Sequence, residues 1–188
     1  ALDFFAKALN SDSRNENAAI LLTLEHIRLK QFEKAFQVAK SIEIDLPSMS
    51  LTLEGVIYRA QLNLPKAKEV FINALKLDND NIPALYYLAE INELLKELKL
   101  AIVDYKKVVT LNTNPKKALI ALLRLSKHKE FNSDISEFLQ GKLKESNNED
   151  IIMVLAEVYV KRSDFGAAIS LLKSKIVEFP TSAKLVDH

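Results

Sequence analysis

The chain repeats a pattern of small and apolar residues about every 34 residues, and this period constrains the fold more than any other feature. One such position recurs along the 188 residues: Ala1, Ala35, Ala67, Ala101, Ile135 and Ala168. Apolar residues follow most of them four and seven positions later, which places all three residues on one face of a helix. Periods of roughly 20–50 residues are typical of stacked-repeat architectures, in which no unit buries its apolar face alone.

Composition agrees with a folded helical chain. Hydrophobic residues make up 48% of the sequence and charged residues 27%, whereas only 3 glycines and 5 prolines are available for turns. The net charge of +1 offers no basic excess for neutralising phosphates, so we expect no nucleic-acid partner. No apolar run is long enough to span a membrane. The absence of cysteine excludes disulfides and thiolate metal sites.

The period divides the chain into units of two helices, which we call helix A and helix B. The expected repeats one to five cover 16–47, 48–81, 82–115, 116–148 and 149–181. Residues 1–13 are expected to form the second helix of a truncated repeat. We therefore predict a single domain over 1–188, which we expect to be a fragment of a longer protein.

The units resemble the tetratricopeptide repeat (TPR), in which small residues sit where two helices cross and large apolar or aromatic residues fill the space between them. Repeat two carries Gly55, Tyr58, Ala67, Phe71 and Ala74 at the matching positions, and repeat five ends with Pro180. The resemblance implies an all-α, right-handed α-α superhelix (a solenoid) of about five TPR helix pairs.

Two repeats depart from the pattern. Repeat two begins early, directly after Pro47, and we expect this to change the local tilt of the stack. Repeat four has Leu123 and Ile135 at positions that are usually small. It also has the longest polar break, Lys144 to Asp150, so we predict an irregular helix B beyond Gly141 and the least orderly packing there.

No arrangement of residues indicates catalysis or a cofactor. The histidines are His26, His128 and His188, and no two of them lie three or four residues apart as a helical metal site requires. His26 occupies an aromatic position and is expected to be packed, whereas His128 is expected to be solvated. Glycine-rich phosphate loops and nucleophile elbows are absent. We therefore predict a chain that is not an enzyme and binds no metal or cofactor.

The TPR resemblance implies that a concave groove lined by the A helices binds a protein or peptide segment. Residues at the corresponding positions form the candidate groove: Thr52, Val56, Arg59, Tyr86, Tyr87, Glu90, Glu93, Lys117, Arg124 and Lys127. The groove would suit a partner with aromatic anchors and charged flanks. The alternative interpretation is that Tyr86 or Tyr87 packs on a neighbouring helix and that Arg124 pairs with Glu90 or Glu93.

A second resemblance is to bacterial TPR lipoproteins of exosortase (PEP-CTERM) exopolysaccharide systems. It depends on Pro47, Gly55 and Tyr58, followed by the segments 67–78 and 83–89. It implies a cell-envelope or periplasmic location and a role in exporting exopolysaccharide or surface proteins, although the sequence itself does not define the compartment. Another hypothesis is a structural spacer of a larger solenoid, or a module that self-associates through uncapped ends, where we expect exposed faces around Phe4, Phe5 and Leu9.

Overall fold

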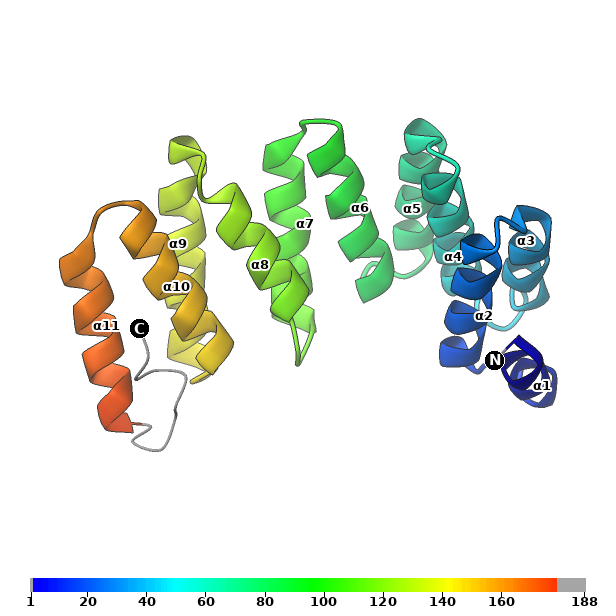
Figure 1. Cartoon of the computed structure of the whole chain (residues 1–188), viewed down its shortest axis with the longest axis horizontal. Helices are drawn as coiled ribbons and strands as arrows, with labels where there is room; N and C mark the ends of the chain where they lie inside the picture. The colour runs from blue at the N-terminus through cyan, green and yellow to red at the C-terminus, as the bar shows by residue number, and fades with distance from the viewer. Residues whose placement is uncertain (1, 179–188) are drawn as a thin grey trace. The chain divides into compact units, whose positions relative to one another are not determined.

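The structure is a computed structural model that describes residues 2–178, with side chains described through residue 174. Over these residues it contains eleven α-helices and no strand (Figure 1). The helices are α1 (Leu2–Ser11), α2 (Glu16–Arg28), α3 (Phe32–Ser41), α4 (Pro47–Ala60), α5 (Leu64–Leu77), α6 (Ile82–Leu94), α7 (Leu98–Leu111), α8 (Lys116–Leu125), α9 (Lys129–Glu145), α10 (Glu149–Lys161) and α11 (Phe165–Glu178). The predicted all-α solenoid is confirmed. The expectations for Ala1, Pro180 and 181–188 lie outside the described residues.

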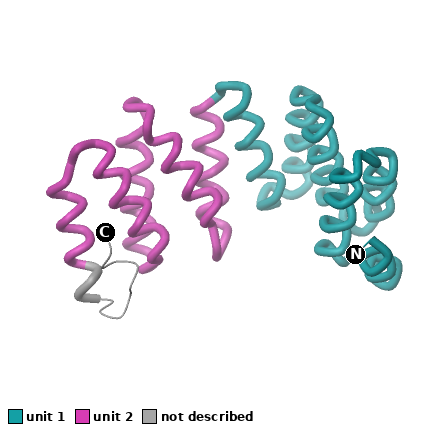
Figure 2. Tube along the Cα trace, viewed as in Figure 1, with its two compact units in different colours: residues 1–97 teal, residues 98–188 magenta. Residues whose placement is uncertain are grey.

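The chain divides into two compact units, residues 1–97 and residues 98–188 (Figure 2). Unit 1 contains α1 to α6, and unit 2 contains α7 to α11. The single domain over 1–188 and the repeat bounds stay predictions.

Small residues allow close helix packing in unit 1. Ala35, Ala67 and Ala74 are fully buried. Gly55 of α4 lies against the buried ring of Phe71 in α5, so closely that a Cβ atom on Gly55 would come within 2.5 Å of the Phe71 Cε1 atom. The small residue at this crossing therefore determines how near the two helix backbones come.

Four A helices end in the same turn. One residue after each of α2, α4, α6 and α10 adopts the left-handed backbone conformation, with φ of 57–64°. These residues are Lys30, Leu62, Lys96 and Ser163. After α4, the Leu62 N–H donates to the Arg59 carbonyl (3.0 Å) and the Asn63 N–H donates to the Tyr58 carbonyl (3.0 Å). This pairing is the Schellman motif, which satisfies the last carbonyl groups of a helix.

Side-chain caps define several helix starts. The side-chain oxygens of Asn15, Asn63, Asn81, Asn148 and Asp164 each accept a hydrogen bond from the backbone N–H three residues later, at 2.9–3.3 Å. These bonds satisfy donors that have no partner within the helix. Asn148 and Asp164 therefore cap α10 and α11, and Pro65 lies in the first turn of α5.

The early start of repeat two coincides with a short helix before it, and the expected change of local tilt stays a prediction. Helix α3 has 10 residues, whereas α5 has 14 residues. After Ser41 the chain forms turns, and α4 then begins at Pro47. Pro47 suits the first position of a helix because its missing N–H would have no partner there.

Repeat four corrects one prediction. Helix α9 runs without interruption through Gly141 to Glu145, so the expected irregularity beyond Gly141 is wrong. A glycine inside a helix costs only about 1 kcal/mol relative to alanine, and the helix-forming residues around it offset this cost. The polar break shrinks to the residues between Glu145 and Glu149. Helix α8 packs less against α9 than against α10, which fits the bulky Leu123 and Ile135.

Candidate functional site

Arg59, Tyr87 and Glu90 meet on the face that α4 and α6 share in unit 1. The Nη2 atom of Arg59 lies 2.8 Å from Oε2 of Glu90, an ion pair without a well-aligned hydrogen bond. The Arg59 Cζ atom also lies 5.5 Å from the centroid of the Tyr87 ring, a cation–π distance. Residues from two successive A helices therefore hold one another in place.

The ring of Tyr87 contacts two other aromatic rings. It stacks on Phe71 of α5, with ring centroids 5.8 Å apart and an interplanar angle of 15°. Tyr86 meets it edge to face at 5.8 Å. Burial raises the pKa of the Tyr87 phenol, Arg59 opposes this effect and Glu90 adds to it. Tyr87 packs on a neighbouring helix, as the alternative interpretation expected, while Tyr86, Tyr87 and Glu93 all stay half-buried.

Two residues of the candidate groove are packing residues. Thr52 is 1% exposed and Val56 is 5% exposed. The Thr52 hydroxyl donates to the Ser48 carbonyl (2.8 Å) and accepts from the Asn81 side-chain amide (3.1 Å). Their burial leaves no side-chain surface for a partner, so we exclude both from the surface proposed below.

The remaining residues of the candidate groove lie in unit 2. Lys117 and Arg124 are exposed on α8, seven residues and about two helical turns apart, so they share a face. Lys127 is exposed in the turn that follows α8. The structure brings Arg59, Tyr86, Tyr87, Glu90 and Glu93 together within unit 1.

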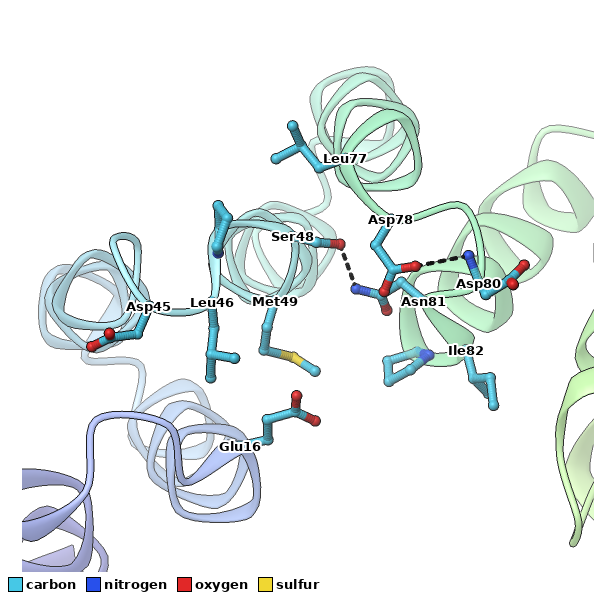
Figure 3. A pocket seen from close by; sticks show the side chains of 12 residues that line it. Glu16, Asp45, Leu46, Ser48, Met49, Leu77, Asp78, Asp80, Asn81 and Ile82 are labelled. Atoms are coloured by element: carbon cyan, nitrogen blue, oxygen red, sulfur yellow. Dashed lines mark hydrogen bonds between the residues drawn. The ribbon is translucent and has the colours of Figure 1, made fainter.

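A polar junction pocket of about 450 Å³ lies where successive repeats meet in unit 1 (Figure 3). The Asn81 amide donates to the Ser48 hydroxyl at 2.8 Å, which joins the start of α6 to the start of α4. The Asp78 carboxylate accepts from the Asp80 N–H at 3.0 Å. Glu16 and Asp45 add further carboxylates to the lining. These bonds order the junction between repeats.

The other polar positions have structural roles. His26 is half-buried, and its Nδ1 lies 3.0 Å from Oε1 of Gln31, as expected for a packed ring. His128 is exposed next to the start of α9. Across residues 2–178, no three His, Cys, Asp or Glu side chains gather as a metal site requires. In the same range, no helix combines the length and apolarity needed to cross a membrane.

Solved structures share this architecture at low sequence identity. YrrB, a TPR protein with an unusual peptide-binding site, is 17% identical with a TM-score of 0.55, and the match covers 100% of this chain and 98% of YrrB. The type IV pilus biogenesis factor PilW is 18% identical with a TM-score of 0.57, covering 97% of this chain and 86% of PilW. Yeast Tom70 is 16% identical with a TM-score of 0.66, covering 92% of this chain and 38% of Tom70.

The chain has the tetratricopeptide repeat fold. No protein-family model matches the sequence, and no curated protein is significantly similar to it. At these identities the solved TPR structures inform the fold alone. The link to exosortase-associated TPR lipoproteins receives no support from them and stays a prediction.

Repeat positions alone did not reveal two features of this TPR chain. The first is the pair of hydrogen bonds from Asn81 to Ser48 and Thr52. These contacts help to bury Thr52, which the repeat pattern assigns to the groove. The second is a group of basic residues at two turns of unit 2. A signal for the second was present, because Lys127 and Lys161 lie at neighbouring positions, 12 and 13, near the ends of the A helices of successive repeats.

Proposed function

We propose that the chain is a non-catalytic protein-interaction scaffold, and that a partner segment binds the Arg59 face, which consists of Arg59, Tyr86, Tyr87, Glu90 and Glu93. The observation that supports this most is the immobilised Tyr87 ring, held by Phe71 and Arg59. Tyrosine and arginine are enriched among residues that dominate binding energy. A side chain that is already fixed loses little conformational entropy when a partner binds.

The charges of this face indicate the kind of partner. Because Arg59 and Glu90 already pair with each other, the aromatic surface of Tyr86 and Tyr87 is the main feature left for a ligand. We infer a partner segment with an apolar or aromatic anchor. Lys117, Arg124 and Lys127 belong to unit 2 and form no part of the Arg59 face.

A peptide selection tests this assignment. Peptides selected against the full chain would be titrated against Arg59→Ala/Tyr86→Ala by calorimetry, and we expect at least about tenfold weaker binding, since truncating such anchors typically costs more than 1 kcal/mol each. The control is Phe4→Ala/Arg14→Ala, which likewise removes one aromatic residue and one arginine from unit 1, both of them exposed and outside the Arg59 face. Equal affinity of the two double variants would reject the Arg59 face.

Self-association is a second candidate, favoured by the aromatic pair of α1, in which Phe4 is exposed and Phe5 is half-buried, whereas Leu9 is buried and is excluded from this surface. Phe4 is 71% exposed and meets Phe5 edge to face at 5.7 Å. We propose that this pair contacts a second copy of the chain. Sedimentation over a concentration range should show dimers that Phe4→Ser removes, whereas Ile44→Ser, at an isolated turn position that is 96% exposed, should leave them unchanged. A concentration-independent monomer would eliminate this candidate.

A further inference from the structure

A basic pocket lies within unit 2, at the turns that end α8 and α10. Its volume is about 600 Å³, and the basic residues that line it are Lys127, Lys129, Lys161 and Arg162. The rest of the lining is three serines and one asparagine, so no carboxylate contributes to it. This pocket is separate from the Arg59 face, which belongs to unit 1.

Among the described residues, no carboxylate forms an ion pair with the four cations of the basic pocket. Elsewhere in the described part of the chain, Lys66, Lys68 and Lys106 form ion pairs with carboxylates. In contrast, Arg162 donates from Nη1 to a neutral group, the Ser136 hydroxyl (3.2 Å). The Lys161 ammonium likewise approaches the Leu123 carbonyl (3.4 Å). An anion placed among these four side chains would gain their attraction without first displacing a carboxylate.

The cations lie close enough to affect one another. Burial lowers the pKa of the Lys161 ammonium, the charge of Lys127 lowers it further, and Glu157 on the preceding helical turn opposes the shift. Lys127 and Lys161 come from different repeats, and the fold brings them to one cavity. A bound anion would relieve the repulsion between them.

The start of α9 adds to the positive potential. His128 at the N-cap of this 17-residue helix forms no side-chain cap. Lys129, Asn132 and Ser133 of its first turns line the pocket. The dipole at a helix start favours a negative group, although Glu130 in the first turn of α9 opposes this attraction in part.

The polar part of the lining includes a buried side chain that has one atom without a hydrogen-bond partner. Asn132 is 7% exposed and donates from Nδ2 to the Ser126 carbonyl at 3.0 Å. Its Oδ1 atom has no hydrogen-bond partner, although buried polar groups are nearly always paired. The weak packing between α8 and α9 explains why a polar space opens here, since Leu123 and Ile135 occupy positions that are small in other repeats.

We propose that the basic pocket binds a polyanion, meaning a ligand with two or more phosphate or carboxylate groups. Its volume lies in the range of roughly 300–1,000 Å³ that holds ligands larger than a single phosphate ion. Four cations provide for more than one anionic group. The ligand is either a free polyphosphate or polycarboxylate, or an acidic segment of a partner protein, because both present the same clustered negative charge.

Calorimetry on the full chain at physiological ionic strength tests the proposal with three probes: sodium phosphate, tripolyphosphate and a capped peptide of six glutamates. We expect the last two to bind and sodium phosphate to bind much more weakly. Tighter binding of tripolyphosphate would identify a small-molecule ligand, and tighter binding of the peptide an acidic protein segment. If neither polyanion binds, or if sodium phosphate binds equally well, the proposal is overturned.

Variants locate the binding. Lys127→Ala/Lys161→Ala should weaken it at least about tenfold, because each substitution removes a charge-assisted hydrogen bond to the ligand. The control Lys116→Ala/Lys173→Ala removes two exposed lysines of unit 2 outside the pocket and should change affinity less than about twofold. Equal losses in both would mean unspecific attraction and would overturn the proposal.

A third variant keeps the cations and adds a carboxylate. Ser163→Asp places it in the lining, at a left-handed position that aspartate tolerates. Thermal unfolding should stay close to that of the parent chain while polyanion binding falls several-fold. Unchanged binding by the folded variant would contradict the assigned site.

Discussion

The crossing of α4 and α5 predicts opposite effects for the same substitution at two helical glycines. In Gly55→Ala the new methyl group would lie 2.5–2.8 Å from three ring atoms of Phe71, which is fully buried and has no free direction in which to move. In Gly141→Ala the new methyl group meets nothing within 4 Å. Both glycines lie inside helices, so the change in helix propensity is the same at the two sites.

The magnitudes follow from two opposing terms. Alanine in place of glycine stabilises a helix interior by about 0.5–1 kcal/mol. Overpacking a well-filled core costs about 1–3 kcal/mol. Gly141→Ala should therefore be stabilising by up to about 1 kcal/mol, whereas Gly55→Ala should be destabilising by up to about 2 kcal/mol. Because propensity cancels in the comparison, the difference of about 1–3 kcal/mol isolates the contact with Phe71.

Native-state hydrogen exchange is the appropriate assay because stacked repeats need not unfold in a single step. Amides of α4 and α5 report on Gly55→Ala, and amides of α9 report on Gly141→Ala. The double variant Gly55→Ala/Phe71→Leu should recover part of the loss, with a coupling energy of about 0.5–3 kcal/mol. If Gly55→Ala protects α4 as much as Gly141→Ala protects α9, the close-packing argument is refuted.

Three further predictions follow from unit 1. Asn81→Ala should lower the free energy of unfolding by about 2–3 kcal/mol in denaturant titrations, against about 1 kcal/mol for Asn63→Ala. The reason is that Asn81 caps α6 and also donates hydrogen bonds to Ser48 and Thr52, whereas the exposed Asn63 only caps α5. Equal losses in the two variants would contradict this. Leu62→Gly should raise the melting temperature, and Ala60→Gly in the last turn of α4 should lower it. Of these two positions, only position 62 has a left-handed backbone that disfavours a side chain. A lower melting temperature for Leu62→Gly would count against the turn geometry. Burial, with a contribution from Glu43, raises the pKa of the Glu54 carboxyl, so the native state holds that proton more tightly and loses stability as the pH rises through the raised pKa. Urea unfolding should therefore show that Glu54→Gln gains stability relative to the parent between about pH 4 and pH 7. An unchanged difference in stability between the variant and the parent would exclude the shift.

The fold could be predicted because helix packing repeats with the sequence. Every small position that the period identifies in the A and B helices of repeats two and three is buried, including Gly55, Ala67 and Ala101. Capping by Asn148 and Asp164 is a local effect, so it too could be predicted from a few neighbouring residues. Helix α9 was mispredicted at Gly141 because one glycine is a weak signal against the helix formers around it.

The candidate site was harder to predict because exposure depends on neighbours that come from other repeats. Thr52 is at a groove position by its number, yet Asn81, 29 residues away, covers its hydroxyl. Lys127 and Lys161 lie at neighbouring repeat positions, but their meeting in one pocket depends on how α8 packs against α9 and α10. A net charge of +1 also conceals a local group of four cations that an average over the chain cannot show.

The left-handed turns after α2, α4, α6 and α10 carry lysine, leucine, lysine and serine, so the backbone geometry recurs while the side chain varies. None of the four is glycine, which means that each turn tolerates a conformational penalty that a glycine would remove. Side chains at these four positions are exposed and take no part in helix packing. New surface chemistry can therefore arise there by single substitutions without a change in the scaffold, and Ser163, at the mouth of the basic pocket, is one such position.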